Sequence, residues 1–435
     1  MRDIQKVVIL GANGTMGAGS AQVFAAGGCD VVLLARSPER AREGLTGAQN
    51  MAKSVRIADR MVIGTYDDDF DKTVSEADLI FEALAEDLEL KKTFFARVDK
   101  HRRPDSLVAT VSSGLSIAGM ARPCSESFRR NFLGIHLFNP PNVIVGTEVI
   151  PHADTDPKLL SDVVEMLQSR FGREVVVCRD MPAFAGNRVG FKVLNEVAQL
   201  AEKHGAVFSD YLIGPQTGRA MAPLATVDLV GWDVHKAIVD NVHANTNDEA
   251  HGAFELPAYM AELIDEGHLG NKTAEKGGFY RRTKEGGKSV TYVLDPASGG
   301  YKPAADIKVQ PIAFVEKMKE LNRIGCYAEA MKLFLAEGCA EAKLARKIVF
   351  GYVSYGLNRV GESEVVAQPR DVDRIMGFGF NWAPPSVIVD VAGVKATIGA
   401  IEGAGLMIPN VLKSLRPGER LFRERGVNIG RFFAA

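Results

Sequence analysis

Several features are scarce in this chain of 435 residues, and each absence excludes a class of protein. The five cysteines are scattered, with no Cys-x-x-Cys pair and no Cys/His cluster, so we expect neither a disulfide framework nor a zinc site. No apolar run reaches the roughly 18 residues of a membrane span. The formal net charge of −2 argues against nucleic acid or an anionic membrane as the main partner. Met1 leads straight into a strand-like segment, which leaves no room for a signal peptide, and we expect a cytoplasmic protein.

Strand-like and helix-like segments alternate through the first 180 or so residues. A length of 435 residues predicts more than one domain, because single domains average about 100–200 residues. The strand-like runs are 4–10, 30–35, 60–63, 77–82, 106–110, 130–136 and 174–178. This alternation predicts an open, mostly parallel α/β sheet of the Rossmann type.

The pattern changes after Pro182, where helical segments joined by Gly and Pro turns begin. Residues 289–303 interrupt them with two short strand-like runs around a turn, which predicts a hairpin. We therefore predict a dinucleotide-binding domain at 1–182, a helical substrate domain at 183–280, a hairpin linker at 281–310 and a second helical domain at 311–435.

The two helical blocks share a spacing of three residues. The matching sets are Pro223, Asp228 and Gly231, and then Pro385, Asp390 and Gly393. Each residue of the second set lies 162 positions after its counterpart in the first set, as Pro385 does after Pro223. This spacing indicates a tandem duplication of one helical module, and two unrelated helical segments are the alternative.

A glycine-rich turn follows the first strand. Gly11, Gly14 and Gly17 have the spacing Gly-x-x-Gly-x-x-Gly, one residue longer than the usual dinucleotide fingerprint. Such a turn presents backbone N–H groups at a helix N-terminus, where a pyrophosphate binds. The predicted cofactor contacts here are Gly11, Asn13, Gly14, Thr15, Met16 and Gly17.

The end of the second strand bears on the choice of cofactor. An acid usually stands there and binds the adenosine ribose, whereas this chain has Ala35 followed by Arg36 and Ser37. Arginine and serine can hold a 2′-phosphate, so the sequence favours NADP over NAD. The alternative is that Arg36 is a solvated side chain and that other contacts hold the cofactor.

A set of polar residues further along offers the groups that alcohol and ketone redox chemistry needs. The set consists of Ser113, His136, Asn139, Glu148 and Asn187. His136 is a candidate base, Glu148 could orient it, and the amides and the hydroxyl could bind a carbonyl oxygen. Together with the glycine turn they predict a hydride-transfer enzyme.

These residues lie in segments that resemble the 3-hydroxyacyl-CoA dehydrogenase family. The matching segments are Ser112-Ser113-Gly114-Leu115, Gly134-Ile135-His136-Leu137-Phe138-Asn139-Pro140, Glu148-Val149-Ile150 and Asp180-Met181-Pro182-Ala183-Phe184-Ala185-Gly186-Asn187-Arg188. In the last of them the family has glycine where this chain has Ala183. Glu82-Ala83-Leu84-Ala85-Glu86 with Lys91, and Lys272-Thr273, resemble its cofactor-side segments. The likeness runs from 5 to 280, and the later block resembles longer members that are fused to an enoyl-CoA hydratase.

The resemblance implies a Rossmann-type domain followed by all-α domains, and oxidation of (3S)-3-hydroxyacyl-CoA or the reverse reaction. It implies that His136 is the base, that Glu148 orients it, and that Ser113 and Asn187 hold the substrate oxygen. Asn139 would support the site, and Glu86, Lys91 and Lys272 would lie beside the NAD or NADP. An acyl-CoA partner and a monomer or homodimer are implied. At the repeat offset the second helical block has Val349-Phe350 in place of Asn187-Arg188, so we predict a structural role for it. The alternatives are a β-hydroxyacid dehydrogenase acting on a non-CoA substrate, or a non-catalytic member of the family.

Overall fold

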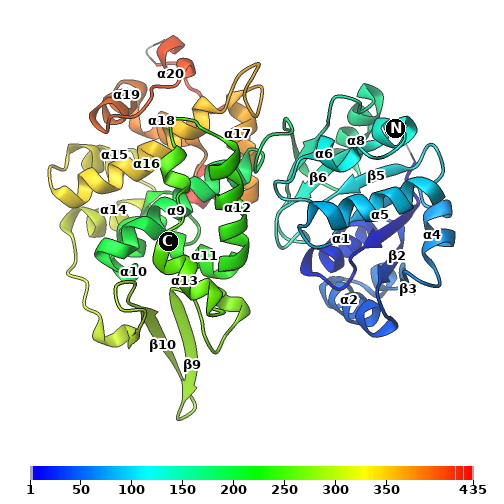
Figure 1. Ribbon diagram of the computed structural model, residues 1–435. Coiled ribbons are helices and arrows are strands. Elements are labelled where there is room, and N and C mark those ends of the chain that lie inside the picture. Colours follow the sequence, from blue (N-terminus) through cyan, green and yellow to red (C-terminus); the bar gives the residue numbers. More distant parts are fainter. Residues whose placement is uncertain (1–2, 417, 425, 434–435) are drawn as a thin grey trace. The chain divides into compact units, whose positions relative to one another are not determined.

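The computed structural model describes residues 3–416, 418–424 and 426–433. The chain divides into two compact units, Met1–Phe184 and Ala185–Ala435, here called unit 1 and unit 2 (Figure 1). Unit 1 is an α/β layer structure, and unit 2 is mainly helical. The predicted fold class is therefore confirmed.

Unit 1 is built on an eight-stranded sheet in the order β3-β2-β1-β4-β5-β6-β7-β8. Its strands are β1 (Lys6–Leu10), β2 (Asp30–Ala35), β3 (Met61–Thr65), β4 (Leu79–Glu82), β5 (Leu107–Thr110), β6 (Phe132–Leu137), β7 (Gly146–Ile150) and β8 (Glu174–Val177). All neighbours are parallel except β6 and β7, which pair antiparallel. Strands that are covered on both faces appear in a sequence as continuous apolar runs, so the first strands could be predicted.

Helices connect the strands of unit 1, and Figure 1 shows α1 and α5 lying over the sheet. They are α1 (Thr15–Ala26), α2 (Pro38–Met51), α3 (Val55–Ala58), α4 (Phe70–Glu76), α5 (Leu88–His101), α6 (Ile117–Ala121), α7 (Glu126–Arg130) and α8 (Pro157–Ser169). Local sequence sets where several of them begin. Ser37 accepts a hydrogen bond from the Arg40 amide before α2, and Asp156 accepts one from Lys158 before α8. In both helices proline takes the first helical position, where no N–H donor is needed.

The helices of unit 2 fall into two runs along the chain. The first consists of α9 (Gly186–His204), α10 (Ala206–Leu212), α11 (Pro223–Val230), α12 (Trp232–Asn245) and α13 (Ala258–Asp265). The second consists of α14 (Ala313–Arg323), α15 (Tyr327–Ala336), α16 (Ala340–Asn358), α17 (Pro369–Ile375), α18 (Pro385–Ala392), α19 (Val394–Gly403) and α20 (Asn410–Ser414). Among the described residues, none of the helices combines the length and the apolar character that a membrane span requires.

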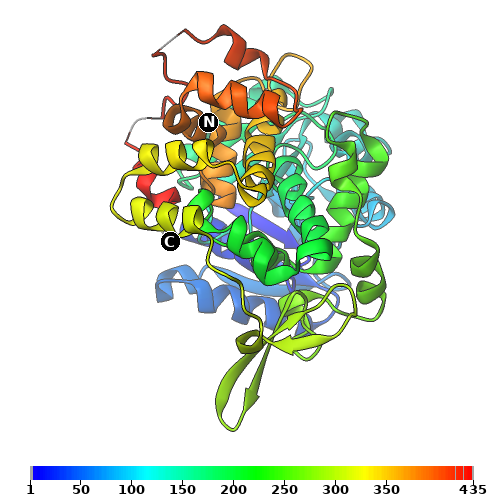
Figure 2. The ribbon, with the colours of Figure 1, turned by 90° about the vertical axis from the view of Figure 1, so that its left-hand side faces the viewer.

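A small three-stranded sheet separates these two runs. It has the order β11-β10-β9, with β9 (Tyr280–Glu285), β10 (Lys288–Leu294) and β11 (Tyr301–Pro303). The predicted hairpin corresponds to the antiparallel pair β10 and β11. β9 was not expected, and it pairs with β10 through a turn at Gly286 and Gly287. The β9–β10 hairpin projects from the helices of unit 2 (Figures 1 and 2).

The helices of unit 2 show the same order twice, and the predicted tandem duplication stays a prediction. Helices α10, α11 and α12 recur as α17, α18 and α19, here called the first and second repeats. Between the second and third helix of each repeat stands a glycine with positive φ, +101° at Gly231 and +86° at Gly393. Only glycine adopts this conformation readily, so both turns have the same backbone requirement.

Two aspartates in each repeat make matching contacts. Asp210 accepts a hydrogen bond from the amide at the start of α11, and Asp373 does the same for α18. Asp228 accepts from the amides of 279 and 280, and Asp390 accepts from those of 421 and 422. The two repeats therefore share these backbone contacts as well as the order of their helices.

Candidate functional site

The glycine turn leaves no room for side chains at two of its positions. Gly11 has φ +91°, and a Cβ added there would lie 2.3 Å from the Ala83 carbonyl oxygen. A Cβ on Gly17 would lie 2.2 Å from the Gly11 carbonyl oxygen. The turn therefore packs backbone against backbone, between β4 on one side and α1 on the other. This geometry requires glycine at both positions.

The outer part of the turn is open to solvent. Asn13, Gly14 and Thr15 are exposed, whereas Met16 is half-buried against the core of unit 1. α1 begins at Thr15, and no side chain caps its N-terminus at Gly14. The first amides of a helix have no partner within that helix, so they can bind an anion. The residues of the turn thus fit the pyrophosphate of a dinucleotide.

The residues after β2 lie at the same edge of the sheet as the glycine turn, because β1 and β2 are parallel neighbours. Ala35 ends β2 in the core, Arg36 is exposed, and Ser37 caps α2. Burial raises the pKa of the Tyr66 hydroxyl to about 12, and the Arg36 guanidinium acts in the opposite direction. Arg36 is thus exposed at the edge of the sheet where the glycine turn lies.

A buried ion pair lies between α5 and the end of β4. The Lys91 ammonium lies 2.7 Å and 2.9 Å from the two carboxylate oxygens of Glu82, and both side chains are fully buried. The Thr110 hydroxyl donates to the same carboxylate. Burial raises the pKa of Glu82, and the Lys91 ammonium acts in the opposite direction. The ion pair ties α5 to the end of β4, and the Thr110 bond joins the end of β5 to the same carboxylate. The predicted place of Lys91 beside the cofactor stays a prediction.

Glu86 links this ion pair to the loop that carries Ser113. Its carboxylate accepts hydrogen bonds from the Ser112 hydroxyl at 2.6 Å and from the Ser113 amide at 2.8 Å. Its other oxygen lies 3.4 Å from the Lys91 nitrogen. The loop after β5 is thereby fixed by a charged network, and Ser113 stands on it half-buried.

His136 and Glu148 face each other across the antiparallel pair β6 and β7, where they are directly opposed in register. The distance from His136 Nδ1 to Glu148 Oε2 is 2.7 Å. Both side chains are almost completely shielded from solvent in unit 1, with 5% and 0% exposed. The bond leaves Nε2 as the ring nitrogen available for proton transfer, because Nδ1–H donates to the carboxylate.

The surroundings of this pair are apolar on the histidine side. The rings of Phe138 and Phe184 lie 4.8 Å and 5.9 Å from the His136 ring, measured between centroids. On the other side the Cys178 thiol donates to Glu148 Oε1 at 3.4 Å. Asn139 is exposed and lies two residues beyond the end of β6, the strand that carries His136.

The segment that leaves unit 1 has an unusual backbone. Ala183 and Phe184 both have positive φ, +59° and +51°, in the left-handed region that favours glycine. Just before them, the Asp180 carboxylate accepts hydrogen bonds from the Ile117 and Ala118 amides at the start of α6. The exit of the chain from unit 1 is therefore tightly held.

Asn187 and Lys272, the remaining predicted residues, belong to unit 2. Asn187 is buried in the first turn of α9, next to Arg188. The Lys272 ammonium pairs with the Asp233 carboxylate at 2.7 Å. The structure thus brings His136 to Glu148, and Glu86 to Lys91 and the Ser113 loop, within unit 1, and it places Asn187 and Lys272 on the helical unit.

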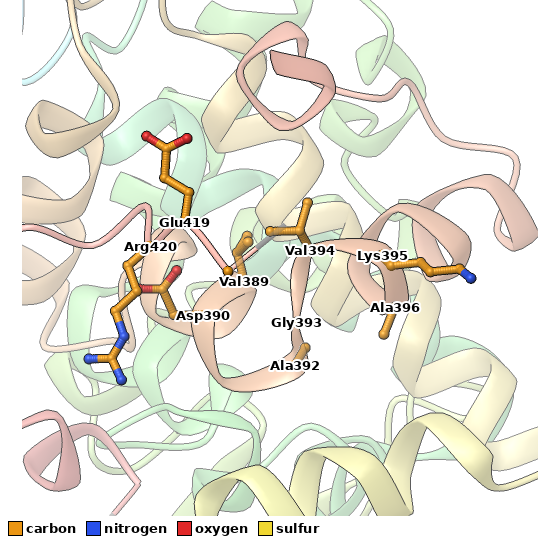
Figure 3. Close-up of a pocket in the computed structure, with 10 residues that line it drawn as sticks. Val389, Asp390, Ala392, Gly393, Val394, Lys395, Ala396, Glu419 and Arg420 are labelled. Atoms are coloured by element: carbon orange, nitrogen blue, oxygen red, sulfur yellow. The ribbon is translucent and has the colours of Figure 1, made fainter. Parts of the chain in front are cut away.

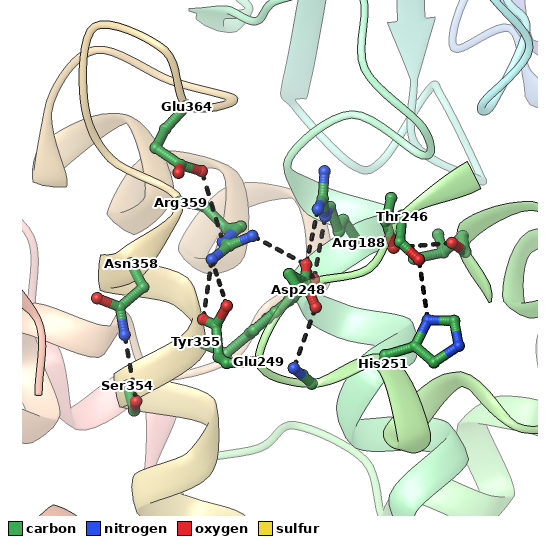
Figure 4. A network of polar contacts seen from close by, with 12 residues as sticks. Arg188, Thr246, Asp248, Glu249, His251, Ser354, Tyr355, Asn358, Arg359 and Glu364 are labelled. Atoms are coloured by element: carbon green, nitrogen blue, oxygen red, sulfur yellow. Dashed lines mark hydrogen bonds and ion pairs between the residues drawn. The ribbon is translucent and has the colours of Figure 1, made fainter. Parts of the chain in front are cut away.

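Arg188 lies at the centre of a polar network in unit 2 (Figure 4). Its guanidinium donates to the Tyr355 hydroxyl at 3.0 Å and to the Asp248 carboxylate at 2.7 Å. Arg359 donates to the same carboxylate at 2.9 Å and, at 2.8 Å, to both oxygens of Glu249. The network ties α9 to α16 and to the segment after α12.

A cavity of about 500 Å³ lies in unit 2, at the turn between α18 and α19 (Figure 3). It is lined by Val389, Asp390, Ala392, Gly393, Val394, Lys395, Ala396, Gly418, Glu419 and Arg420. None of the predicted site residues is among them. In the part of the chain that the structure describes, no group of three or more His, Cys, Asp or Glu side chains could hold a metal ion.

Two polar residues of unit 1 lie at the predicted sites but were not predicted from the sequence. The Tyr66 hydroxyl contacts the glycine turn, and Cys178 contacts Glu148. Tyr66 is separated from its partner by 55 positions, and Cys178 by 30. A tyrosine or cysteine next to an apolar strand is ordinarily a core residue, so the sequence carried no signal for either contact.

Comparison with known proteins bears on the family. Residues 6–181 match the model of the 3-hydroxyacyl-CoA dehydrogenase NAD binding domain, and residues 184–282 match that family's C-terminal domain. A hydroxyacyl-coenzyme A dehydrogenase of Sus scrofa is 32% identical over 64% of this chain and 91% of its own length. A probable 3-hydroxyacyl-CoA dehydrogenase of Bacillus subtilis is 30% identical over 95% of this chain, which spans about half, 54%, of that relative.

Solved structures show the same fold. The crystal structure of 3-hydroxybutyryl-CoA dehydrogenase from Escherichia coli K12 has a TM-score of 0.68 and 22% identity, covering 95% of this chain and 98% of that one. FadB2 of M. tuberculosis has a TM-score of 0.59 and 25% identity, covering 65% and 100%. With its NAD-binding and C-terminal domains both matched, the chain belongs to the 3-hydroxyacyl-CoA dehydrogenase family of NAD-dependent oxidoreductases.

Proposed function

We propose that this protein interconverts (3S)-3-hydroxyacyl-CoA and 3-oxoacyl-CoA, with His136 and Glu148 as its acid–base pair. The observation that carries the proposal is the 2.7 Å bond between the two side chains, in the unit that matches the family's NAD binding domain. A buried histidine that is oriented by a carboxylate has one ring nitrogen left to exchange a proton with substrate.

In the oxidation, the substrate loses a hydride from C3 and a proton from its 3-hydroxyl, and a different group accepts each. A bound dinucleotide would accept the hydride that leaves C3, and the residues of the glycine turn would hold its pyrophosphate. His136 Nε2 takes the proton of the 3-hydroxyl as the carbonyl forms, and it returns the proton in the reverse reaction. Glu148 stabilises the resulting imidazolium through Nδ1. Ser113 and Asn187 hold the substrate oxygen, and Asn139 supports the histidine.

The test is His136→Gln, which keeps the size and polarity of the side chain but removes the base. We expect turnover of acetoacetyl-CoA to fall by roughly 10²–10⁴-fold, the usual contribution of a general base. Binding of the reduced cofactor, followed by its fluorescence, should be unchanged. His101→Gln, on α5, is the matched control and should keep full activity. A His136→Gln enzyme with near wild-type turnover would contradict the acid–base assignment.

The same assay separates the thioester from the free acid. Acetoacetyl-CoA and acetoacetate are compared at equal concentration, with NADH and NADPH in parallel. We expect turnover of the thioester with at least one of the two cofactors. Faster turnover of the free acid would instead identify a β-hydroxyacid dehydrogenase.

We further propose that NADP(H) is used at least as well as NAD(H), because Ala35 supplies no carboxylate for the ribose and Arg36 is exposed beside it. One charge-assisted hydrogen bond to a phosphate is worth roughly 1.5–3 kcal/mol, at least about tenfold in affinity. Arg36→Ala should therefore lower kcat/KM for NADPH about tenfold or more and leave that for NADH nearly unchanged.

Arg40→Ala is the control, because Arg40 lies on the same helix but pairs with Glu43. It should not change the ratio of the two kcat/KM values. Equal losses for both cofactors in Arg36→Ala, or strict use of NADH by the wild type, would show that Arg36 does not contact the 2′-phosphate.

A further inference from the structure

Tyr66 is the first residue after β3, and aromatic neighbours fix its ring. Its amide donates to the Ala35 carbonyl at 3.0 Å, so the backbone stays in register with β2. The ring meets that of Phe94 edge-on at 5.0 Å and that of Phe70 at 6.4 Å, measured between centroids. Only 7% of the residue is exposed. Tyr66 therefore has little freedom to move its hydroxyl.

That hydroxyl reaches the first glycine of the nucleotide turn. It accepts a hydrogen bond from the Gly11 amide at 2.8 Å, and both groups are buried. On the other side, Gly11 lies against the Ala83 backbone. The turn is thus held from β3 by a side chain and from β4 by the main chain.

We propose that Tyr66 is a positioning residue for the dinucleotide, acting through the Gly11 amide. A buried N–H without an acceptor is unfavourable, so without the hydroxyl the turn would shift to find another partner. Binding of the pyrophosphate would then have to restore the shape that the wild type already has. Loss of this preorganisation weakens binding without altering the chemical step.

This inference depends on the proposed function, since it requires a dinucleotide at the glycine turn. The variant is Tyr66→Phe, which removes the hydroxyl and keeps the ring. Dissociation constants for NADH and NADPH are measured by fluorescence titration without acyl-CoA, and kcat and cofactor KM are measured separately. We expect both the dissociation constants and KM to rise by roughly tenfold. At saturating cofactor, kcat should stay within about twofold of the wild type.

Tyr259→Phe is the matched control. Tyr259 is also 7% exposed, and its hydroxyl donates to a backbone carbonyl, that of Ala198, at 2.9 Å in unit 2. It reports the general effect of removing a buried tyrosine hydroxyl, and we expect normal cofactor binding. Equal dissociation constants in Tyr66→Phe and the wild type would overturn the inference. A wild type that binds neither cofactor would instead overturn the proposed function.

Hydrogen exchange tests the same contact in the unaltered enzyme. Without cofactor, the amide of Gly11 should exchange far more slowly than that of exposed Asn13, because it is bonded to Tyr66. In Tyr66→Phe the protection of Gly11 should be lost, while that of the neighbouring strand β1 remains. If Gly11 exchanged as fast as Asn13 in the wild type, the inference would be wrong even if the variant did not fold.

Discussion

In the second repeat, the buried carboxylate of Asp373 lacks a hydrogen bond that its counterpart receives. Asp210 accepts from the Leu224 amide at 2.8 Å and from the Tyr280 hydroxyl at 2.8 Å. Asp373 accepts from the Ser386 amide at 3.0 Å, and its Oδ2 has no hydrogen-bond partner among the described residues. Asp210 Oδ2 receives the Tyr280 hydroxyl and, at 3.2 Å, the Ala225 amide, and neither donor has a counterpart at Asp373 Oδ2.

The repeat shows why the hydroxyl is missing. Asp228 accepts from the amides of Phe279 and Tyr280, and Asp390 accepts in the same way from those of 421 and 422. The Phe422 amide therefore makes the contact that the Tyr280 amide makes in the first repeat, and the phenylalanine side chain has no O–H group to donate.

The consequence is a dependence of stability on pH. Burial raises the pKa of Asp373 to about 7, from an ordinary value of 3.8. Because the folded pKa is above the unfolded one, the folded protein holds an extra proton between about pH 4 and pH 7. The stability that Asp373 contributes is therefore present below pH 4 and is lost as the pH rises to 7. At 1.36 kcal/mol per unit, a shift of about three units corresponds to about 4 kcal/mol.

Asp373→Asn tests this argument, because the amide mimics the protonated acid and keeps an acceptor for the Ser386 amide. Urea denaturation at pH 4.5 and pH 8 gives the free energy of unfolding. We expect the variant to be close to the wild type at pH 4.5 and more stable by up to about 4 kcal/mol at pH 8. Asp67→Asn, at an exposed position, is the control. The reasoning would be refuted if wild type and Asp373→Asn lost the same stability between the two pH values.

Three other substitutions have expected effects on stability. Phe422→Tyr should add about 1 kcal/mol to the free energy of unfolding at pH 8, because the new hydroxyl would donate to Asp373 Oδ2. An unchanged denaturation midpoint would mean that Phe422 and Tyr280 are not equivalent. Ala183→Gly should raise the free energy of unfolding by roughly 0.5–1 kcal/mol, because Ala183 has a strained φ of +59°. Ala185→Gly is the control and should lower the free energy of unfolding, because its φ is −92°. If Ala183→Gly were destabilising and Ala185→Gly stabilising, the backbone at Ala183 would not be strained. Lys91→Met should cost roughly 3–5 kcal/mol by leaving Glu82 buried without its partner. Adding Glu82→Gln should recover much of that loss, and a double variant no better than the single one would argue against the ion pair.

The sequence predicted the family, the fold class and most strands of unit 1, because these depend on local patterns. Apolar runs marked β1, β2 and β4, and glycine spacing marked the turn between β1 and α1. The strand β7 was not predicted. It is five residues long with Glu148 at its centre, and an acid in so short a run does not read as a buried strand. Only its partner β6 explains the position of the acid, through the bond to His136.

Contacts between distant residues were beyond what the sequence could give. Lys91 lies on an amphipathic helix, where a lysine is expected at the surface, yet it is fully buried against Glu82. The Arg188 contact with Tyr355 spans 167 positions. Pattern analysis ranks each residue by its own chemistry, whereas these roles come from the partner that the fold provides. The predicted roles of Ser113, Asn139, Asn187 and Lys272 in binding remain predictions for the same reason.

The contacts of α9 predict what the second helical block does. A Cβ on Gly190 would lie 2.2 Å from the ring of Phe380, so helix and ring are in close contact, and Arg188 bonds to Tyr355 on α16. A chain that ends at Tyr280 would expose this face of α9, at a cost of about 25 cal/mol for each Å² of apolar surface. We expect such a chain to be insoluble or newly dimeric, measured by light scattering after size-exclusion chromatography beside the full chain. A soluble, fully active monomer would show that the apolar face of α9 does not have to be buried by the second helical block. The role of that block would then need another explanation.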